Sequence, residues 1–517
     1  MPKVTIDGQN LEVREGTNLI EAARQAGIEV PHYCYHPKLS VAGNCRMCLV
    51  EIEKSPKLQI ACNTKVAEGM VVHTRNTRVE KARRSVLEFI LINHPIDCPV
   101  CDQAGECKLQ EYYMKYDQSS SRFPIEEKVH KEKAIDLGPW VMLDMERCIL
   151  CSRCVRFCQE VAEEEELCIA ERGDHSVLTA FPGKKLENPY SANVVEVCPV
   201  GALTNKDFRF KCRVWFLERT ESVCPGCSMG CNINIDQHEG KIYRLTPRVN
   251  EGVNECWMCD EGRVTYKPVN QENRLRFAKI KEKFVSPDEA LRSIREMMTG
   301  VDPTLVCGIG SAQFTNEDNY ALMRFLKECG VAHFFYHRSE PQNPSSDDYL
   351  IQADKNPNTT GVTALGFKEI GGDRRFKIVF ALGPLSEEKL KGITLEKQRK
   401  VIVFTAWDEN PPSPPFVKGG HEGDFADIVL PVPTFAETDG TFTNCQGRVQ
   451  RIRPAFPPRG EARPVWQWLS HLTRFLERPV PSYDTARGLF LEMTQDSAAF
   501  KGMDYEKIGG QGMLLKK

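Results

Sequence analysis

The chain opens with short alternations of apolar and polar residues. Residues 4–8 and 11–13 alternate around an Asp-Gly pair, which predicts two strands joined by a tight turn. A short helix is expected over residues 18–26, capped by Thr17 and ended by Gly27. Two strands and a helix before a cysteine-rich loop indicate a small α+β unit.

Further along, the pattern becomes helical and then alternates strands with helices. Residues 79–115 carry helical periodicity, and the charged stretch 115–140 indicates a connector. After residue 260, helix-like stretches such as 316–329 separate short apolar runs, from which we expect a parallel sheet with helices on both faces. These runs predict buried strands at 304–306, 376–382, 401–405 and 427–430. Prolines and glycines in 411–420 indicate an exposed loop.

Composition narrows the class of protein. The 517 residues are enough for several domains, and 41% hydrophobic with 27% charged residues is typical of a soluble protein. The apolar runs are too short to cross a bilayer, and a net charge of −3 gives no basic excess for nucleic acid. The first residues lack the apolar core of a signal peptide, so we expect a cytoplasmic chain. Its 22 cysteines, many in C-x2-C spacing, then indicate metal or cluster ligation.

The first cysteine set has the spacing C-x10-C-x2-C-x13-C and consists of Cys34, Cys45, Cys48 and Cys62. Four thiolates can hold a [2Fe-2S] cluster, and the small residues 42–44 let backbone amides approach sulfur. Zinc, the alternative, more often takes two separated C-x2-C pairs, so the spacing favours the cluster. The strands and the motif at 45–51 resemble the plant-type ferredoxin module, with wider spacing here.

The second set combines His94 with Cys98, Cys101 and Cys107, as H-x3-C-x2-C-x5-C. A lone histidine near a helix end is more often a surface or capping residue. Here three neighbouring thiols leave one coordination position for the imidazole, which indicates a [4Fe-4S] cluster. Imidazole is neutral where thiolate is negative, so this ligand should raise the reduction potential of the cluster.

A bacterial-ferredoxin run, C-x2-C-x2-C-x3-C, begins at Cys148. In two-cluster ferredoxins the first three cysteines and a distant Cys-Pro hold one cluster, and the fourth cysteine serves the other. Positions 188, 191 and 194, where a second run would place cysteines, hold Asn, Ser and Val. One [4Fe-4S] cluster is therefore expected, on Cys148, Cys151, Cys154 and Cys198. Cys158 is interpreted as a buried structural thiol.

The fourth set is C-x2-C-x3-C at Cys224, Cys227 and Cys231, with a fourth ligand from Cys256 or Cys259. We favour Cys259, because its turn sequence can bring the backbone close to a [4Fe-4S] cluster. The other cysteines are interpreted as small hydrophobic side chains; they are Cys158, Cys168, Cys212, Cys256, Cys307, Cys329 and Cys445.

Four segments resemble the family of large iron–sulfur subunits (75 kDa, or G, type) of respiratory complex I, NADH:quinone oxidoreductase. They are HPIDCPVCDQAGEC at 94–107, CILCSRCVRFC at 148–158, NVVEVCPVGALT at 193–204 and FAETDGTFTNCQGRVQ at 435–450. The resemblance spans nearly the whole chain and is strongest up to residue 265. In that family the last ligand precedes Asp-x-Gly-Arg, which also favours Cys259.

The resemblance implies a multidomain chain of α+β and α/β type. The expected domains are a β-grasp [2Fe-2S] ferredoxin domain (1–78), a His(Cys)3 [4Fe-4S] segment (79–118), a ferredoxin-like domain with one [4Fe-4S] cluster (138–216), a [4Fe-4S] domain of the molybdopterin-enzyme type (217–273) and a shortened molybdopterin-oxidoreductase-like α/β domain (274–517). The last domain is interpreted as a structural remnant.

The resemblance also implies a function. Electrons would come from a flavoprotein subunit that binds FMN and oxidises NADH, and pass to cluster-bearing subunits leading to quinone, while the whole complex translocates protons. The implied cofactors are one [2Fe-2S] and three [4Fe-4S] clusters without molybdopterin, and no catalytic site is expected on this chain. The implied place is the hydrophilic arm, peripheral on the cytoplasmic side of the inner membrane, with only indirect contact to the membrane arm and none with nucleic acid.

The alternative is the catalytic subunit of an NAD-linked formate dehydrogenase, which shares the cluster series. Such a molybdopterin enzyme needs a protein ligand to molybdenum or tungsten. Cys307 lies in a predicted buried strand and is interpreted as core, with the metal-ligand interpretation kept as the weaker one. Gly308-x-Gly310 is interpreted as a tight turn more than a dinucleotide site. An iron-only hydrogenase is disfavoured, because its cysteine-rich catalytic domain has no counterpart after residue 260.

Overall fold

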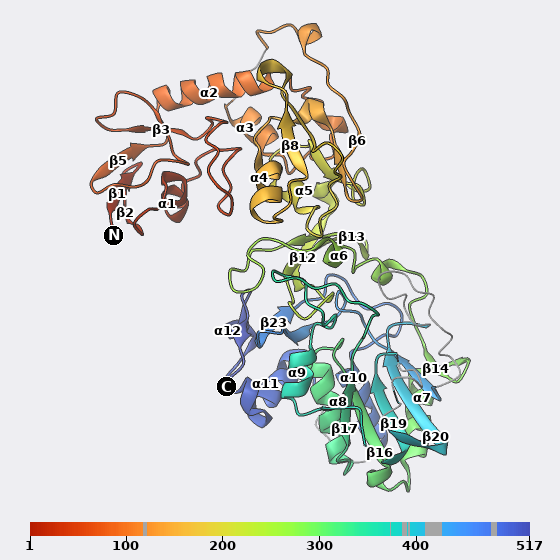
Figure 1. The fold of residues 1–517 in the computed structure, drawn as a ribbon. Coiled ribbons are helices and arrows are strands. Elements are labelled where there is room, and N and C mark those ends of the chain that lie inside the picture. The colour runs from red at the N-terminus through yellow and green to blue at the C-terminus, as the bar shows by residue number, and fades with distance from the viewer. Residues whose placement is uncertain are drawn as a thin grey trace. The chain divides into compact units, whose positions relative to one another are not determined.

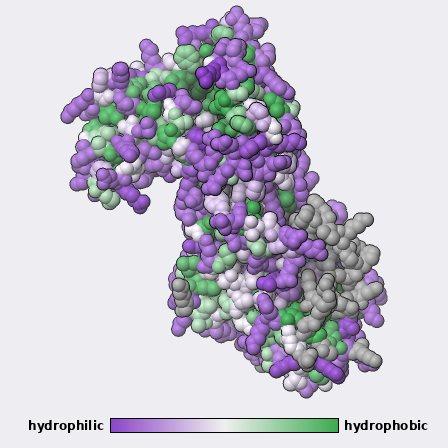
Figure 2. All heavy atoms as spheres, viewed as in Figure 1, coloured by the Kyte–Doolittle hydropathy of each residue, from purple (hydrophilic) through white to green (hydrophobic). Residues whose placement is uncertain are grey.

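The computed structural model describes residues 1–116, 121–372, 374–384, 390, 393–408, 426–476 and 483–516. They form two units, Met1–Leu217 and Glu218–Lys517, each with its own sheets and helices (Figure 1). None of the described helices is long and apolar enough to span a bilayer. The face of the molecule in Figure 2 is mostly hydrophilic, with apolar side chains scattered among polar ones.

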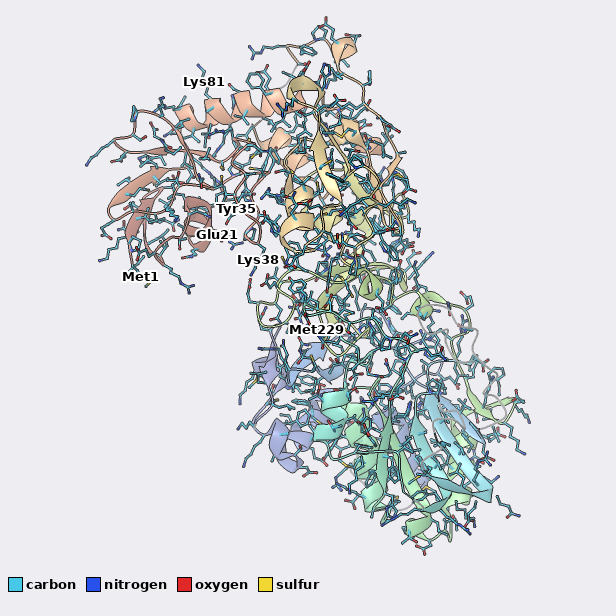
Figure 3. All side chains as sticks on the ribbon, in the orientation of Figure 1. Met1, Glu21, Tyr35, Lys38, Lys81 and Met229 are labelled. Atoms are coloured by element: carbon cyan, nitrogen blue, oxygen red, sulfur yellow. The ribbon has the colours of Figure 1, made fainter. Side chains whose placement is uncertain are left out.

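The first unit begins with a five-stranded sheet in the order β2-β1-β5-β3-β4. The apolar side of α1 packs on it, and the side chain of Asn18 accepts the N–H of Glu21. Asn18 therefore caps α1, and the expected cap, Thr17, is wrong by one residue. The Tyr35 hydroxyl donates to the Glu21 carboxylate at 2.9 Å and ties the helix to the first cysteine loop (Figure 3). The elements are β1 (Lys3–Ile6), β2 (Gln9–Glu12), α1 (Leu19–Gln25), β3 (Leu49–Ile52), β4 (Gln59–Ile60) and β5 (Met70–His73).

The rest of the first unit consists of short elements around cysteine loops. The helical stretch expected over 79–115 forms two helices, α2 and α3, separated by the loop that carries His94. A three-stranded sheet, β10-β7-β6, and a hairpin, β8-β9, follow. The bounds are α2 (Thr77–Leu91), α3 (Lys108–Tyr116), β6 (Ile135–Asp136), β7 (Val141–Leu143), α4 (Arg153–Glu160), β8 (Leu167–Ala170), β9 (Val177–Ala180), α5 (Asn193–Val197) and β10 (Leu203–Asn205).

The second unit contains a small antiparallel sheet, β11-β12-β13, and an eight-stranded sheet in the order β15-β14-β21-β20-β19-β16-β17-β18. The strands from β21 to β18 run parallel, as expected, whereas β14 and β15 form an antiparallel edge. On one face, apolar side chains of α7, α8, α10 and α11 join Phe380 and Phe404. On the other face Val379 and Val403 pack with Leu390, and among the described residues the four helices named above lie on the first face.

The remaining elements follow in chain order. They are β11 (Glu218–Val223), β12 (Asn232–His238), β13 (Lys241–Pro247), α6 (Asp260–Arg263), β14 (Ala278–Ile280), β15 (Lys283–Val285), α7 (Pro287–Met298), β16 (Val306–Ser311), α8 (Asn316–Glu328), β17 (Phe334–His337), α9 (Thr359–Ala364), β18 (Lys368–Glu369), β19 (Arg375–Leu382), β20 (Thr394–Thr405), β21 (Ile428–Pro431), β22 (Gly440–Thr443), β23 (Arg448–Ile452), α10 (Val465–Leu476), α11 (Ala486–Asp496), α12 (Tyr505–Ile508) and β24 (Met513–Leu514).

Three of the four expected strands coincide with β19, β20 and β21, and the fourth is displaced. Pro303–Leu305 forms a 3₁₀ turn opened by proline, and β16 begins only at Val306. Gly308 lies inside β16 and not in the expected tight turn. A Cβ at this position would lie 2.7 Å from the side chain of Leu326 on α8, so only a glycine leaves room for this helix. The role of Gly308 is close helix packing. The loop expected at 411–420 lies outside the described residues.

Candidate iron–sulfur cluster sites

The Cys34 site (Cys34, Cys45, Cys48 and Cys62) lies in the loops before β3 and after β4. Three of its cysteines are buried and Cys45 is half-buried. The N–H of Cys34 donates to Sγ of Cys45 at 3.4 Å. A hydrogen bond from the Cys45 thiol lowers the pKa of Cys34 to about 5, and one from Cys48 lowers the pKa of Cys62. The thiols therefore gather as two hydrogen-bonded pairs that also repel one another electrostatically, which suits four ligands of one cluster.

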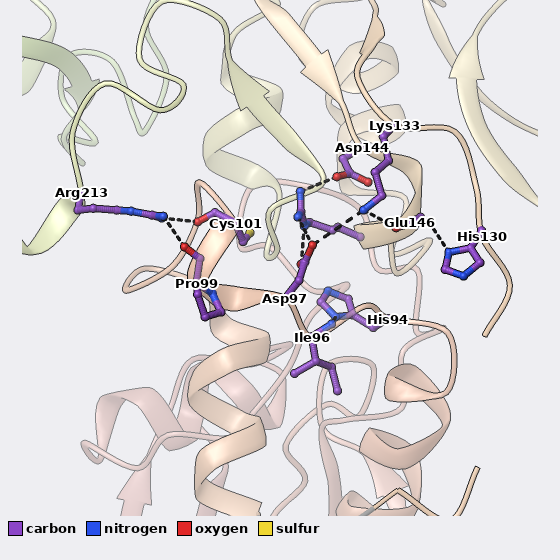
Figure 4. A network of polar contacts seen from close by, with 11 residues as sticks. His94, Ile96, Asp97, Pro99, Cys101, His130, Lys133, Asp144, Glu146 and Arg213 are labelled. Carbon is purple, nitrogen blue, oxygen red and sulfur yellow. Dashed lines mark hydrogen bonds and ion pairs between the residues drawn. The ribbon is translucent and has the colours of Figure 1, made fainter. Parts of the chain in front are cut away.

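The His94 site (His94, Cys98, Cys101 and Cys107) surrounds a cavity between α2 and α3. Burial lowers the pKa of His94 to about 4, so its imidazole is neutral at neutral pH and suited to bind a metal. Nδ1 accepts the N–H of Ile96 at 3.2 Å (Figure 4). This hydrogen bond orients the ring and leaves Nε2 as the nitrogen for a cluster.

Two arginines hold the loop between His94 and Cys101, and Figure 4 labels one of them, Arg213. Arg147 is buried and donates to Asp97 at 2.6 Å. Arg213 donates to the carbonyl oxygen of Cys101 at 2.6 Å and to that of Pro99 at 2.5 Å. Charge-assisted bonds of this kind fix backbone position more firmly than neutral ones. Neither arginine carries a signal in the ligand spacing, so the sequence motifs did not identify them.

The Cys148 site (Cys148, Cys151, Cys154 and Cys198) lines an apolar cavity together with Ile169 and Leu203. Burial raises the pKa of Cys148 to about 12 and that of Cys151 to about 11. The free thiols are therefore neutral at neutral pH, and the positive charge of iron is what would deprotonate them. The N–H of Leu150 points to Sγ of Cys148 at 3.5 Å. Leu150 has a φ of 53°, a strained value that wraps the loop around the cavity.

The residues at the positions where a second ferredoxin run would place cysteines are buried. Asn188 and Ser191 are buried, and the N–H of Asn188 donates to the Glu166 carboxylate at 2.9 Å. Cys158 is fully buried in α4 and is not among the residues that line the Cys148 cavity. Its burial agrees with its interpretation as a structural thiol.

The Cys224 site (Cys224, Cys227, Cys231 and Cys259) lies in the second unit, and all four cysteines are buried. Burial raises the pKa of Cys259 to about 12, with a further rise from the thiol of Cys227. The N–H of Gly262 donates to Sγ of Cys259 at 3.3 Å, and that of Gly226 to Sγ of Cys224 at 3.5 Å. Cys256 is half-buried, and its electrostatic interaction with Tyr349 contributes to the raised pKa of that hydroxyl. This geometry favours Cys259 over Cys256 as the fourth ligand.

Two glycines make room for sulfur. A Cβ on Gly201 would lie 2.4 Å from Sγ of Cys101, and one on Gly262 would lie 3.2 Å from Sγ of Cys224 and 3.4 Å from Sγ of Cys259. Neither glycine has a positive φ, so the requirement is space and not backbone conformation. Cradles of this kind, with amides directed at sulfur, fit iron–sulfur clusters.

Short contacts join the ligand loops of the first unit. The side-chain amide of Asn44, beside Cys45, donates to the carbonyl oxygen of Leu150 at 3.1 Å. The carbonyl oxygen of Pro199, beside Cys198, accepts the N–H of Lys108 at 3.2 Å. The Cys148 site is thus bonded to the loops of both the Cys34 and the His94 site.

Two cysteines outside the four ligand sets, Cys307 and Cys445, lie in different surroundings. Cys307 is fully buried in β16, in a core that includes Phe376 and Val379, which supports its interpretation as core. The N–H of Cys445 donates to the carbonyl oxygen of Ser228 at 2.7 Å, so this exposed thiol lies next to the Cys224 site, which the spacing did not indicate. Among the described residues, no group of three or more His, Cys, Asp or Glu side chains is arranged to hold a single metal ion.

Family models match most of the chain. They are the 2Fe-2S iron-sulfur cluster binding domain (residues 2–77), the NADH-ubiquinone oxidoreductase-G iron-sulfur binding region (83–122), the NADH-quinone oxidoreductase subunit 3 ferredoxin-like domain (138–204), the NADH-ubiquinone oxidoreductase NDSU1/NuoG-like 4Fe-4S domain (217–267) and molybdopterin oxidoreductase (416–475). These matches confirm the expected fold class, with iron–sulfur domains followed by a molybdopterin-oxidoreductase-like domain.

Relatives agree with the family models. The G-type subunit of NADH-quinone oxidoreductase from Rickettsia bellii is 41% identical over 338 residues, which are 65% of this chain and 49% of the relative. The NADH-ubiquinone oxidoreductase 78 kDa subunit of Candida albicans is 32% identical over 604 residues, covering 93% of this chain and 83% of the relative. The match therefore spans about half the length of the Rickettsia relative. A solved NAD+-reducing [NiFe]-hydrogenase chain matches at 31% identity over 41% of this chain and 91% of its own, with a TM-score of 0.37.

Proposed function

We propose that this chain, which belongs to the family of G-type (75 kDa) subunits of NADH-quinone oxidoreductase, carries electrons through iron–sulfur clusters within an NADH:quinone oxidoreductase. Electrons enter from a flavoprotein subunit that binds FMN and NADH and leave to cluster-bearing subunits on the way to quinone. The complex as a whole couples this transfer to proton translocation. The chain lies in the hydrophilic arm on the cytoplasmic side of the inner membrane and contacts the membrane arm only indirectly.

The cofactors of the proposal are one [2Fe-2S] cluster at the Cys34 site and one [4Fe-4S] cluster at each of the His94, Cys148 and Cys224 sites. When bound, such clusters accept and release one electron at a time. The protein holds them through thiolates and one imidazole, excludes water by burial, and directs backbone N–H groups at the ligand sulfurs. In this proposal the side chains hold the clusters and neither form nor break a covalent bond.

The observation that supports the proposal most is the contact between ligand loops in the first unit. Asn44 and Leu150 join the loops of the Cys34 and Cys148 sites, and Pro199 and Lys108 join those of the Cys148 and His94 sites. Electron tunnelling weakens steeply with distance, so adjoining sites are what a transfer path requires. The formate dehydrogenase alternative is not favoured, because the relatives are subunits of NADH-quinone oxidoreductases and Cys307 is a core residue.

The first test is metal content after anaerobic purification. The proposal expects about 14 iron atoms per chain and no molybdenum or tungsten. Stoichiometric molybdenum or tungsten would move the function to the formate dehydrogenase class. The second test is the rate of NADH-dependent quinone reduction by the assembled complex with Cys151 and Cys154 both replaced by Ala. A full rate in this variant would exclude the Cys148 site from the electron path.

A matched pair of variants tests the fourth ligand of the Cys224 site. Cys259→Ala should lose about four iron atoms per chain, because its thiol is buried against the other ligands. Cys256→Ala should keep the full iron content. The reverse result would assign the ligand to Cys256.

A further inference from the structure

One buried arginine is bonded to the ligand loops of two cluster sites. Arg156 lies on α4, one turn after the cysteines that open the Cys148 site, and its side chain is buried. Its Nη2 donates to the carbonyl oxygen of Cys34 at 2.6 Å and to that of Cys151 at 3.3 Å. Its Nη1 donates to the carbonyl oxygen of Ser40. A single guanidinium therefore connects the backbone of one ligand from each site.

Two other side chains of α4 also bond to the loop that carries Cys34. Arg153, one helical turn before Arg156, donates to the carbonyl oxygen of Tyr35 and to that of Val197, the residue before Cys198. Glu160, one turn after Arg156, accepts the N–H of Ser40 at 2.8 Å. Helix α4 thus holds the loop 34–40 through three side chains that are each about one turn apart.

The charge of Arg156 has no carboxylate partner among the described residues. All of its hydrogen bonds go to uncharged oxygens, the last being the Ser152 hydroxyl at 3.2 Å. The nearby Glu160 binds Ser40 instead. A buried cation without an anion is costly. Clusters held by four thiolates carry net negative charge, so the Cys34 and Cys148 sites are the anions that would compensate it.

We propose that Arg156 is a positioning residue for electron transfer between the Cys34 and Cys148 sites. It keeps the two ligand loops in register, and its positive charge stabilises the extra electron on either cluster, which raises both reduction potentials. The inference rests on the proposed function, because it needs clusters at these two sites. It does not extend to the His94 site, whose ligands Arg156 does not bind.

The test compares two substitutions in the full chain within its complex. Arg156→Gln removes the charge but keeps hydrogen-bond donors, and Arg156→Lys keeps the charge but loses the planar fork. Arg24→Gln, at an exposed arginine of α1, is the control. The measurements are iron content, the reduction midpoint of each cluster followed by electron paramagnetic resonance, and the magnetic interaction between the two clusters.

We expect Arg156→Gln to lower the midpoints at the Cys34 and Cys148 sites, each by a tenfold change in the reduction equilibrium, which is about 59 mV for one electron. The midpoint at the His94 site should not move. Arg156→Lys should restore both midpoints while weakening the magnetic interaction, because one ammonium cannot span the same carbonyl oxygens. Arg24→Gln should match the unsubstituted protein.

Other outcomes also decide the matter. Unchanged midpoints in Arg156→Gln with full iron would overturn the inference, as would equal shifts in the Gln and Lys variants, which would make the residue purely structural. If the Gln variant loses iron at both sites and the Lys variant does not, the charge is required for assembly and the inference stands. If both variants lose iron at these sites, the positive charge has no special role and the inference is refuted. Absence of cluster signals in the unsubstituted protein would instead refute the proposed function.

Discussion

Gly201→Ala adds a single methyl group and should remove one cluster while sparing the others. Gly201 follows the Cys-Pro segment of the Cys148 site, yet its missing side chain faces the His94 site. A Cβ at this position would lie 2.4 Å from Sγ of Cys101 and 3.0 Å from Cβ of Gln103. Ordinary contacts of a Cβ begin near 3.4 Å, so the sulfur would have to move by about 1 Å.

A displacement of this size exceeds what a ligand set tolerates, because metal–ligand distances are held within about 0.2 Å. We also expect overpacking to cost about 1 to 3 kcal/mol in the free energy of unfolding, since Arg213 holds the backbone of Cys101 in place. The variant should lose about four of the proposed 14 iron atoms per chain. The electron paramagnetic resonance signal of the His94 cluster should disappear, and the signals of the Cys34 and Cys148 clusters should remain.

The control is Gly371→Ala, because a Cβ on Gly371 meets nothing within 4 Å. It should keep full iron content and all cluster signals. Retention of the His94 signal in Gly201→Ala, with unchanged iron, would refute the reasoning. It would mean that Cys101 is not a ligand or that the loop adjusts freely.

Three further changes test features of the fold. Glu437→Gln should destabilise the second unit by about 3 to 5 kcal/mol in thermal or urea unfolding, because Arg274 and Glu437 form a fully buried ion pair at 2.6 Å; a loss below about 1 kcal/mol would contradict this. Glu317→Gln should flatten the pH dependence of stability. Burial raises the pKa of Glu317 from 4.5 to about 8, so the folded state binds this proton more tightly and stability falls as pH rises between these values; equal slopes in both proteins would count against it. Cys158→Ala should keep full iron content and lose about 1 to 2 kcal/mol of stability, because Cys158 is a fully buried core thiol; loss of iron would make it a ligand.

Local sequence patterns predicted the elements better than their ends. The strands around the Asp-Gly turn and the helix Asn316–Glu328 form as expected. The cap of α1 was wrong by one residue, because Thr17 and Asn18 are both good capping residues and only the backbone decides which oxygen reaches the Glu21 N–H. The strand predicted at 304–306 was wrong in position, because Pro303 opens a 3₁₀ turn that hydrophobic periodicity does not detect.

Residue spacing predicts a cysteine ligand set most directly where the ligands are close in sequence. A C-x2-C segment directs both sulfurs to one point through the covalent geometry of a few residues. Distant ligands are different. In the structure the choice of Cys259 over Cys256 gains support from the burial of Cys259 and from the amide of Gly262 on its sulfur. The space that Gly201 leaves for Cys101 has no local signature.

Residue types and short spacings were enough to predict the family and the fold class, whereas the ligand sets and the domain bounds stay predictions. Which sites adjoin could be learned only from the packing of the folded chain. In the sequence the His94 ligands come between those of the Cys34 and Cys148 sites, but in space Arg156 bonds the Cys34 and Cys148 loops directly. The physical reason is that contacts between distant loops follow from how whole elements pack, and many packings are compatible with the same local spacing.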